Sequence, residues 1–133
     1  MTRRNISSGG PWEAVVGYSR AVRVGDVIHV AGSTAAQPDG SVASPGDAYA
    51  QAKAALATIE KALTEAGSSL TDVVRTRVYL TDIGHWQEVG RAHGELFGTI
   101  KPASTMLQVS RLVHPDMLVE IEAEAIVTPQ GGG

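Results

Sequence analysis

Two stretches near the C-terminus carry side chains that could do chemistry. Residues 101–106 read Lys-Pro-Ala-Ser-Thr-Met, and residues 118–127 alternate apolar residues with carboxylates. Because alternate side chains of a strand share a face, Glu120, Glu122 and Glu124 are expected to project from one side. A glutamate held beside a ligand can position water or shuttle a proton. It can equally form a structural ion pair with a strand arginine, and both interpretations of Glu120 stay open.

The arginines that could pair with these carboxylates lie on the segment 73–81. Arg75 and Arg77 alternate there with Thr76 and Val78, so they are expected on the same sheet face as the carboxylates. That face is either solvated or buried between subunits with its charges paired. Arg77 is a candidate for binding an anionic ligand group, although an ion pair between subunits is the commoner fate of such an arginine.

Gly, Pro and Asp residues separate segments of clear periodicity, which predicts the elements that position these side chains. Gly25 and Asp26 indicate a hairpin turn, and Gly67 marks the end of a long amphipathic helix. A sheet with both helices on one face is the simplest way to bury the helical stripes, so the pattern predicts an α+β two-layer sandwich. The predicted strands are 19–24, 27–31, 73–81, 105–110 and 118–127, and the predicted helices are 47–66 and 86–97.

Length and composition predict a single domain over residues 1–133, with an N-terminal arm at 1–10 and a flexible tail at 128–133. The net charge of -3 provides no basic surface for nucleic acid or an anionic membrane. The absence of cysteine excludes disulfides and thiolate chemistry. No segment is long and apolar enough to cross a bilayer, so a cytoplasmic protein is expected.

Four motifs together resemble the RidA (YjgF) family along nearly the whole chain: Gly17-Tyr18-Ser19, Val30-Ala31-Gly32, the segment 101–106, and Leu118 to Ala123. The resemblance implies a mixed sheet of the chorismate mutase-like (RidA) type and a homotrimer with ligand sites between subunits. It also implies hydrolysis of reactive enamines and imines without a cofactor.

The resemblance assigns roles to individual residues. Tyr18 matches an aromatic residue near the first strand, Gly32 matches the glycine that ends the second, and Glu120 matches the glutamate that holds water or substrate. Ser104 stands where the family's deaminases have an arginine, and no serine hydroxyl reproduces the bidentate clamp of a guanidinium on a carboxylate. Met106 occupies a position whose backbone contacts ligand, so its backbone contribution is expected to survive.

Three further residues complete the predicted site. Thr105 is expected to orient the ligand together with the backbone of Met106. Trp12 lies in a glycine-flanked loop and either lids a pocket or anchors the N-terminal arm. His93 falls on the helical stripe that carries Trp86, which favours a packed, hydrogen-bonded histidine over a general base. The four histidines fall on separate elements, so no metal site is predicted.

The sequence therefore supports two main hypotheses. The first is a cofactor-free trimer that binds a small metabolite and hydrolyses or tautomerises an enamine, imine or related carbonyl compound, but is not a standard 2-imino acid deaminase. The second is a non-enzymatic binding or interaction protein on the same scaffold. Endoribonuclease activity ranks last, because the acidic balance leaves no basic groove.

Overall fold

The computed structural model describes residues 2–128 of the chain. These residues form a six-stranded mixed sheet in the order β1-β2-β3-β6-β4-β5. The strands are β1 (Arg3–Ile6), β2 (Ala21–Val24), β3 (Val27–Ser33), β4 (Val73–Leu80), β5 (Ala103–Gln108) and β6 (Val119–Ile126). The helices are α1 (Glu13–Val16), α2 (Ala48–Glu65) and α3 (Trp86–Phe97), with 3₁₀ turns at Leu70–Asp72 and Ile83–His85.

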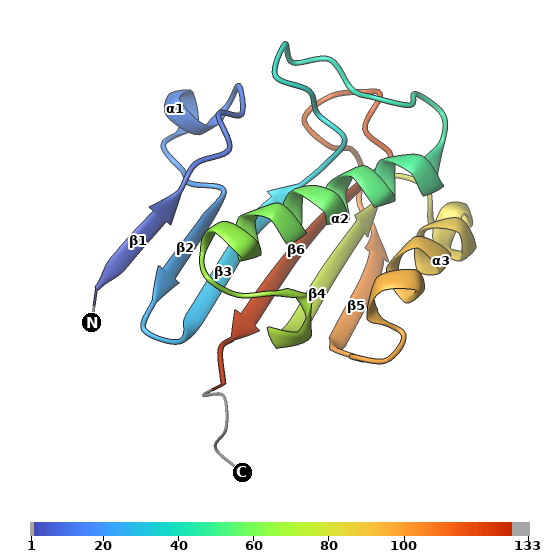
Figure 1. Cartoon of the computed structure of the whole chain (residues 1–133). Helices are drawn as coiled ribbons and strands as arrows, with labels where there is room; N and C mark the ends of the chain where they lie inside the picture. The colour runs from blue at the N-terminus through green and yellow to red at the C-terminus, as the bar shows by residue number, and fades with distance from the viewer. Residues whose placement is uncertain (1, 129–133) are drawn as a thin grey trace.

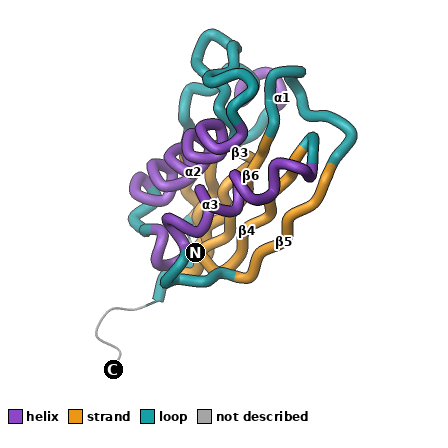
Figure 2. The backbone as a smooth tube through the Cα atoms, turned by 90° about the vertical axis from the view of Figure 1, so that its right-hand side faces the viewer, coloured by secondary structure: helices purple, strands orange, loops and turns teal. Residues whose placement is uncertain are grey.

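The two long helices cover one face of the sheet. Figure 1 shows α2 crossing in front of the central strands, and α3 lying to its right at the β5 side of the sheet. The turned view in Figure 2 shows both helices on the same side of the strands. Among the described residues no helix covers the opposite face. The predicted α+β sandwich with two helices on one face is confirmed.

Helix α2 forms as its sequence predicts. Asp47 caps the start by accepting a hydrogen bond from the backbone N–H of Ala50. At the other end, Gly67 adopts φ +84° and the N–H of Ser68 donates to the carbonyl of Leu63, which is the usual glycine-terminated helix end. One side of the helix is buried and packs against β3 and β6. Its buried residues are Ala48, Gln51, Ala52, Ala55, Leu56, Ile59, Ala62 and Leu63.

The central strands also follow the predicted alternation. On β4, Thr76, Val78 and Leu80 are buried against the helices. On β6 the residues Val119, Ile121, Ala123 and Ala125 are buried on the same side. The antiparallel register places Arg77 opposite Glu122 and Tyr79 opposite Glu120 on the open face. The face on which Arg77 and the β6 glutamates lie is therefore set by hydrophobic patterning.

Three parts of the prediction differ from the structure. Residues Arg3–Ile6 of the expected arm form β1, an edge strand that the sequence does not signal because only Ile6 is buried. Strand β5 begins at Ala103 instead of residue 105; it is also an edge strand, mostly exposed, so it lacks an apolar pattern. Trp86 is 55% exposed at the start of α3 and does not belong to the buried stripe.

The expected tail at 128–133 lies, apart from Thr128, outside the described residues. No helix among the residues described has both the length and the apolar character needed to span a membrane.

Candidate functional site

Four of the predicted site residues line one cavity of about 540 Å³. Glu120 comes from β6, Gly32 from β3, and Tyr18 from the turn after α1. Trp12 stands immediately before α1. The cavity wall is completed by the N-terminal segment 6–11, by residues of α2, and by Val113 and Met117. Its lining is more apolar than polar, which suits a small organic molecule with few polar groups.

Glu120 is the half-buried carboxylate of this cavity, which the exposed Glu65 also lines, and it lies directly against Gly32. A Cβ at residue 32 would fall on the Glu120 carboxylate, so glycine is the residue that leaves room for it. Burial raises the pKa of Glu120, the charge of Arg20 opposes that rise, and the charge of Glu122 adds to it. Within residues 2–128 no group donates a hydrogen bond to this carboxylate. Within residues 2–128 Glu120 makes no ion pair with Arg75 or Arg77, because the register places Tyr79 opposite Glu120. The alternative pairing across a subunit interface stays a prediction.

Arg20 is the cation whose charge acts on this carboxylate, and it was not among the predicted site residues. The residue is 7% exposed, and its guanidinium donates to the carbonyl of Gly32 at 2.5 Å and to Ser33 Oγ at 3.1 Å. A third, longer hydrogen bond of 3.3 Å reaches the hydroxyl of Tyr18. The Nε atom is buried without a hydrogen-bond partner among the described residues. Arginines beside strands are usually surface residues, so spacing alone does not identify this one.

Hydrogen bonds to Glu13 hold the N-terminal segment 6–11, which forms part of the cavity wall. Its carboxylate accepts hydrogen bonds from Ser7, from both the backbone and the hydroxyl of Ser8, and from the backbone of Gly10. Burial raises the pKa of Glu13, but these hydrogen bonds outweigh burial and the pKa is lowered overall. Trp12 packs against the small cluster formed by Ala35, Val42 and Met117. Trp12 thus anchors this segment and also forms part of the cavity wall.

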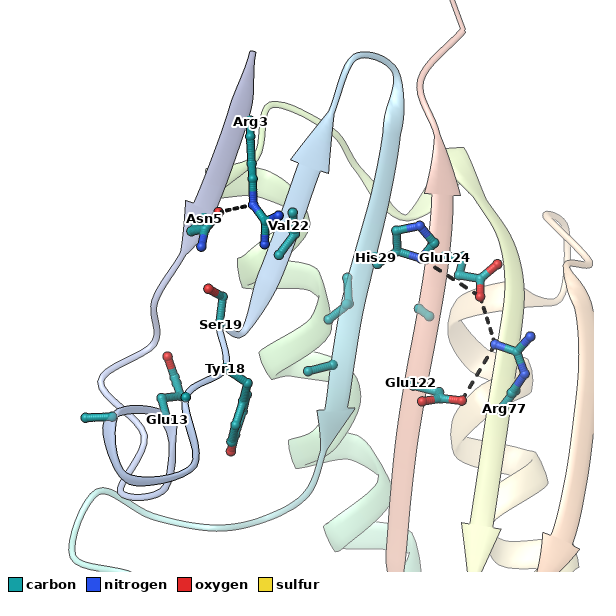
Figure 3. A pocket seen from close by; sticks show the side chains of 15 residues that line it. Arg3, Asn5, Glu13, Tyr18, Ser19, Val22, His29, Arg77, Glu122 and Glu124 are labelled. Atoms are coloured by element: carbon teal, nitrogen blue, oxygen red, sulfur yellow. Dashed lines mark hydrogen bonds and ion pairs between the residues drawn. The ribbon is translucent and has the colours of Figure 1, made fainter. Parts of the chain in front are cut away.

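Arg77 lies on the open face of the sheet and is engaged by carboxylates of its own chain. Its guanidinium donates to Glu124 at 2.9 Å and lies 3.6 Å from Glu122. Tyr79 donates to Glu122 at 2.7 Å, and the hydrogen bond from Arg77 lowers the pKa of Glu124. Figure 3 shows Arg77 between Glu122 and Glu124 at a shallow pocket of about 620 Å³ that Tyr18 also lines. Arg77 thus has carboxylate partners in its own chain, and the ion pair between subunits stays a prediction.

The remaining predicted residues lie apart from both cavities, at the β5 edge. Ser104 Oγ accepts a hydrogen bond from Thr76 Oγ1 at 2.8 Å, and Thr105 Oγ1 accepts one from Arg75 at 2.8 Å. Met106 is half-buried on the same strand. In the sheet order, β4 separates this strand from β6 and Glu120. One chain therefore presents the predicted site in two separate parts.

His93 belongs to the β5 part. Its Nε2 atom lies 2.9 Å from Thr76 Oγ1, and its ring packs on Phe97 with 4.6 Å between centroids. Burial lowers the pKa of His93. The packed, hydrogen-bonded histidine that the helical stripe favoured is what the structure contains. Across residues 2–128 no group of three or more His, Asp or Glu residues is arranged to hold a metal ion.

Comparison with known proteins gives this geometry a context. A crystal structure of a YjgF/YER057c/UK114 family member from Mycobacterium tuberculosis superposes with a TM-score of 0.86 at 48% identity, covering 95% of this chain and 100% of that one. An uncharacterized protein of Streptomyces coelicolor is 42% identical over 92% of this chain and 90% of its own length. A protein of Acinetobacter baylyi named 3-aminoacrylate deaminase RutC is 34% identical over 96% of this chain and 100% of its own.

The family model described as Endoribonuclease L-PSP matches residues 11–127, which include both parts of the candidate site. This match and the relatives above agree with the motifs around Tyr18, Gly32 and Glu120. The chain therefore belongs to the Endoribonuclease L-PSP family, which is the RidA or YjgF family that its sequence resembles.

Proposed function

We propose that this protein binds a small metabolite in clefts between the subunits of a homotrimer and hydrolyses or tautomerises an enamine, imine or related carbonyl compound without a cofactor. The observation that carries the proposal is the Glu120 carboxylate, half-buried and free of hydrogen-bond partners among residues 2–128, at the wall of a mostly apolar cavity. The printed name of the Acinetobacter relative, a 3-aminoacrylate deaminase, supports the same substrate class.

The chemistry needs a group that both accepts and returns a proton. An enamine first becomes an iminium ion when the protonated Glu120 carboxyl gives its proton to the β-carbon, and an imine enters the same path once its nitrogen is protonated. Water then adds to the iminium carbon while the Glu120 carboxylate accepts one water proton, which leaves a carbinolamine. The carboxyl returns this proton to the nitrogen, and the carbon–nitrogen bond breaks to release ammonia while the carbinolamine hydroxyl gives its proton to Glu120 and becomes the carbonyl. Burial raises the pKa of Glu120, which brings it closer to neutral pH and suits a group that works in both directions. Tyr18 and Trp12 supply aromatic walls.

A second subunit explains why the candidate site is divided. Ser104, Thr105 and Met106 lie at one edge of the sheet, whereas Glu120 and Gly32 lie on inner strands. In a trimer of the family type, the β5 edge of one subunit would approach the Glu120 cavity of the next. The open sheet face, with the charges of Arg77, Glu122 and Glu124 already paired, is a surface that such an assembly can bury.

Substrate preference would differ from that of a standard 2-imino acid deaminase. The position of the clamping arginine is Ser104, whose hydroxyl is bonded to Thr76. Arg77 is held by Glu124 and Glu122, so it is not a free replacement. Without a bidentate guanidinium the substrate carboxylate loses its strongest partner. We therefore expect little or no activity on 2-imino acids.

The decisive experiment measures turnover of freshly generated 2-iminopropanamide and 2-iminopropanoate, an uncharged and an anionic imine, against their spontaneous hydrolysis. Glu120→Gln should lower the enzymatic rate on an accepted substrate by about 100-fold or more, because general acid–base groups contribute at that level. Glu60→Gln on the exposed surface of α2 is the matched control and should leave the rate unchanged. Equal rates for Glu120→Gln and the control would refute the assignment of Glu120, and rapid turnover of 2-iminopropanoate would refute the expected preference.

The replacement of the clamping arginine by Ser104 also supports a second function, that of a non-enzymatic binding protein on this scaffold. In that case the wild type would bind small carbonyl compounds saturably and yet hydrolyse neither substrate above the spontaneous rate. Endoribonuclease activity, which the name of the family model suggests, has the least support. The net charge is -3, and carboxylates line the open sheet face.

A further inference from the structure

A chain of three hydrogen-bonded side chains runs from α3 to the sheet edge. His93 Nε2 lies 2.9 Å from Thr76 Oγ1, and Thr76 Oγ1 donates to Ser104 Oγ over 2.8 Å. Thr76 is completely buried, whereas Ser104 is exposed on the edge strand β5. The chain therefore connects an interior histidine with a hydroxyl that a ligand can reach.

The proton of Thr76 fixes the direction of every hydrogen bond in this chain. A hydroxyl has a single proton, and Thr76 gives it to Ser104. The Thr76 oxygen must then accept from His93, which requires a proton on Nε2. Burial lowers the pKa of His93, so the ring is neutral near pH 7 and carries one N–H. Ser104 Oγ is thus an acceptor toward the interior, and its own proton points outward.

The surrounding structure holds all three groups in place. The parallel register of β4 and β5 pairs Thr76 with Ser104, so their side chains share the helix-covered face. His93 is held by packing on the buried ring of Phe97. A threonine is β-branched and has restricted side-chain freedom, which keeps its hydroxyl between the two partners. The orientation of Ser104 is therefore set by the fold before any ligand arrives.

We infer that Ser104 is a preoriented hydrogen-bond donor for the uncharged carbonyl oxygen of a small ligand, and that Thr76 and His93 are positioning residues for it. One neutral hydroxyl gives a single hydrogen bond, whereas a carboxylate needs charge-assisted partners to replace its hydration. Arg75 does not supply that charge here, since it donates to Thr105, whose side chain lies on the other face of β5. The inference rests on the proposed small-molecule cleft and adds the ligand's functional group.

The orientation can be tested without a ligand. In ¹⁵N-histidine-labelled protein, the ring nitrogen shifts of His93 should show a neutral Nε2–H tautomer. Thr76→Val removes the hydroxyl with little change of shape and should abolish that preference, whereas Thr76→Ser keeps the hydroxyl and should restore it. A thermal melt confirms that each variant is folded, and Ser110→Ala, at an exposed position outside these contacts, is the control and should leave the tautomer unchanged. An Nδ1–H tautomer in the wild type would reverse the direction of the hydrogen bonds from His93 through Thr76 to Ser104 and would overturn the inference.

The ligand preference is tested with pyruvamide and pyruvate, which differ only in an amide against a carboxylate. The wild-type assembly should bind pyruvamide more tightly, and Thr76→Val and Ser104→Ala should each weaken pyruvamide by about two- to tenfold, the value of one net hydrogen bond. Thr76→Ser should bind like the wild type. Tighter binding of pyruvate, no binding of pyruvamide to the wild type, or unchanged binding in Ser104→Ala would overturn the carbonyl assignment.

The two proposals fail separately. If the protein hydrolyses neither imine above the spontaneous rate but still binds pyruvamide through Ser104, the hydrolytic function is refuted and the carbonyl subsite is kept. Turnover that depends on Glu120 but is indifferent to Ser104→Ala and Thr76→Val would keep the hydrolytic function and remove the subsite.

Discussion

The Glu120 carboxylate owes its character to the absence of a side chain at residue 32. Gly32 lets the carboxylate approach the backbone of β3, where burial raises its pKa and Arg20 partly offsets that rise. The buried Arg20 is itself tied to the carbonyl of Gly32. A carboxyl group with a raised pKa and no hydrogen-bond partner in the described part of the chain is the feature most typical of a catalytic position.

Gly32→Ala tests this close approach. Its φ lies outside the left-handed region, so alanine adds no backbone strain, but the new Cβ would displace the flexible end of Glu120. The pKa of Glu120 should move toward its ordinary value, and substrate turnover should fall by about 100-fold, as a misplaced catalytic group does. Carboxyl ¹³C titration and rate measurements provide the readouts. Gly90→Ala, where a Cβ meets nothing within 4 Å, is the control.

The pH dependence of stability gives a second test of Glu120. A carboxyl whose folded-state pKa is raised contributes stability below its ordinary value of 4.5, and this is lost as the pH rises through the folded-state value. Glu120→Gln removes this loss. The unfolding free energy of the variant relative to wild type should therefore increase from about pH 4 to about pH 8. Urea denaturation across that range measures it, and a flat difference would show that the pKa is not raised.

At the scale of elements, the glycines of the helices have opposite roles. Gly67 ends α2 with φ +84°, and a Cβ there would lie 3.1 Å from the guanidinium of Arg23. Gly90 lies in the interior of α3 with open space around its Cβ position. Gly67 is required by its backbone conformation. Gly90 is not, and a glycine inside a helix lowers the stability of that helix.

Gly67→Ala should therefore lower the free energy of unfolding by about 1–2 kcal/mol, the cost of a left-handed residue with a side chain. Gly90→Ala should raise it by about 0.5–1 kcal/mol, because alanine orders more readily in a helix. Chemical denaturation of both variants measures the two shifts. A loss of stability in Gly90→Ala would mean that a neighbouring subunit occupies the space beside Gly90.

Elements with a buried apolar side were predictable, and elements without one were not. The stripe of α2 and the alternation of β4 and β6 specify their own faces, so their bounds agree with the structure within one or two residues. The edge strands β1 and β5 expose most of their side chains, and their backbone pairing leaves no sequence period. Strand β5 carries the predicted site residues Ser104 and Thr105, and the start of this strand was predicted two residues too late.

At the scale of the whole molecule, the open sheet face is the surface most suited to assembly. Figures 1 and 2 show both long helices on the other side. On the open face Arg77 compensates Glu122 and Glu124, which lowers the cost of burying these charges together. An intersubunit contact here would also join the two parts of the candidate site.

The assembly that the family resemblance implies is a homotrimer. Light scattering after size exclusion should give three times the mass of one chain, and Arg77→Ala should favour dissociation by leaving two carboxylates uncompensated. Lys53→Ala, on the helical side and in an exposed ion pair with Glu95, should not change the mass. A wild-type mass of one chain would refute the trimer and the intersubunit cleft together.

The sequence by itself determined the fold class, the faces of the central strands and the family, because hydrophobic periodicity and local motifs are properties of contiguous residues. It also identified Glu120, Gly32 and Tyr18 as parts of one site. Tertiary structure alone decided that Arg20 lies buried beside Glu120, that Arg77 is paired within its own chain, and that Thr76 links His93 to Ser104. These contacts join residues from different elements, and only strand register and helix packing bring such residues together.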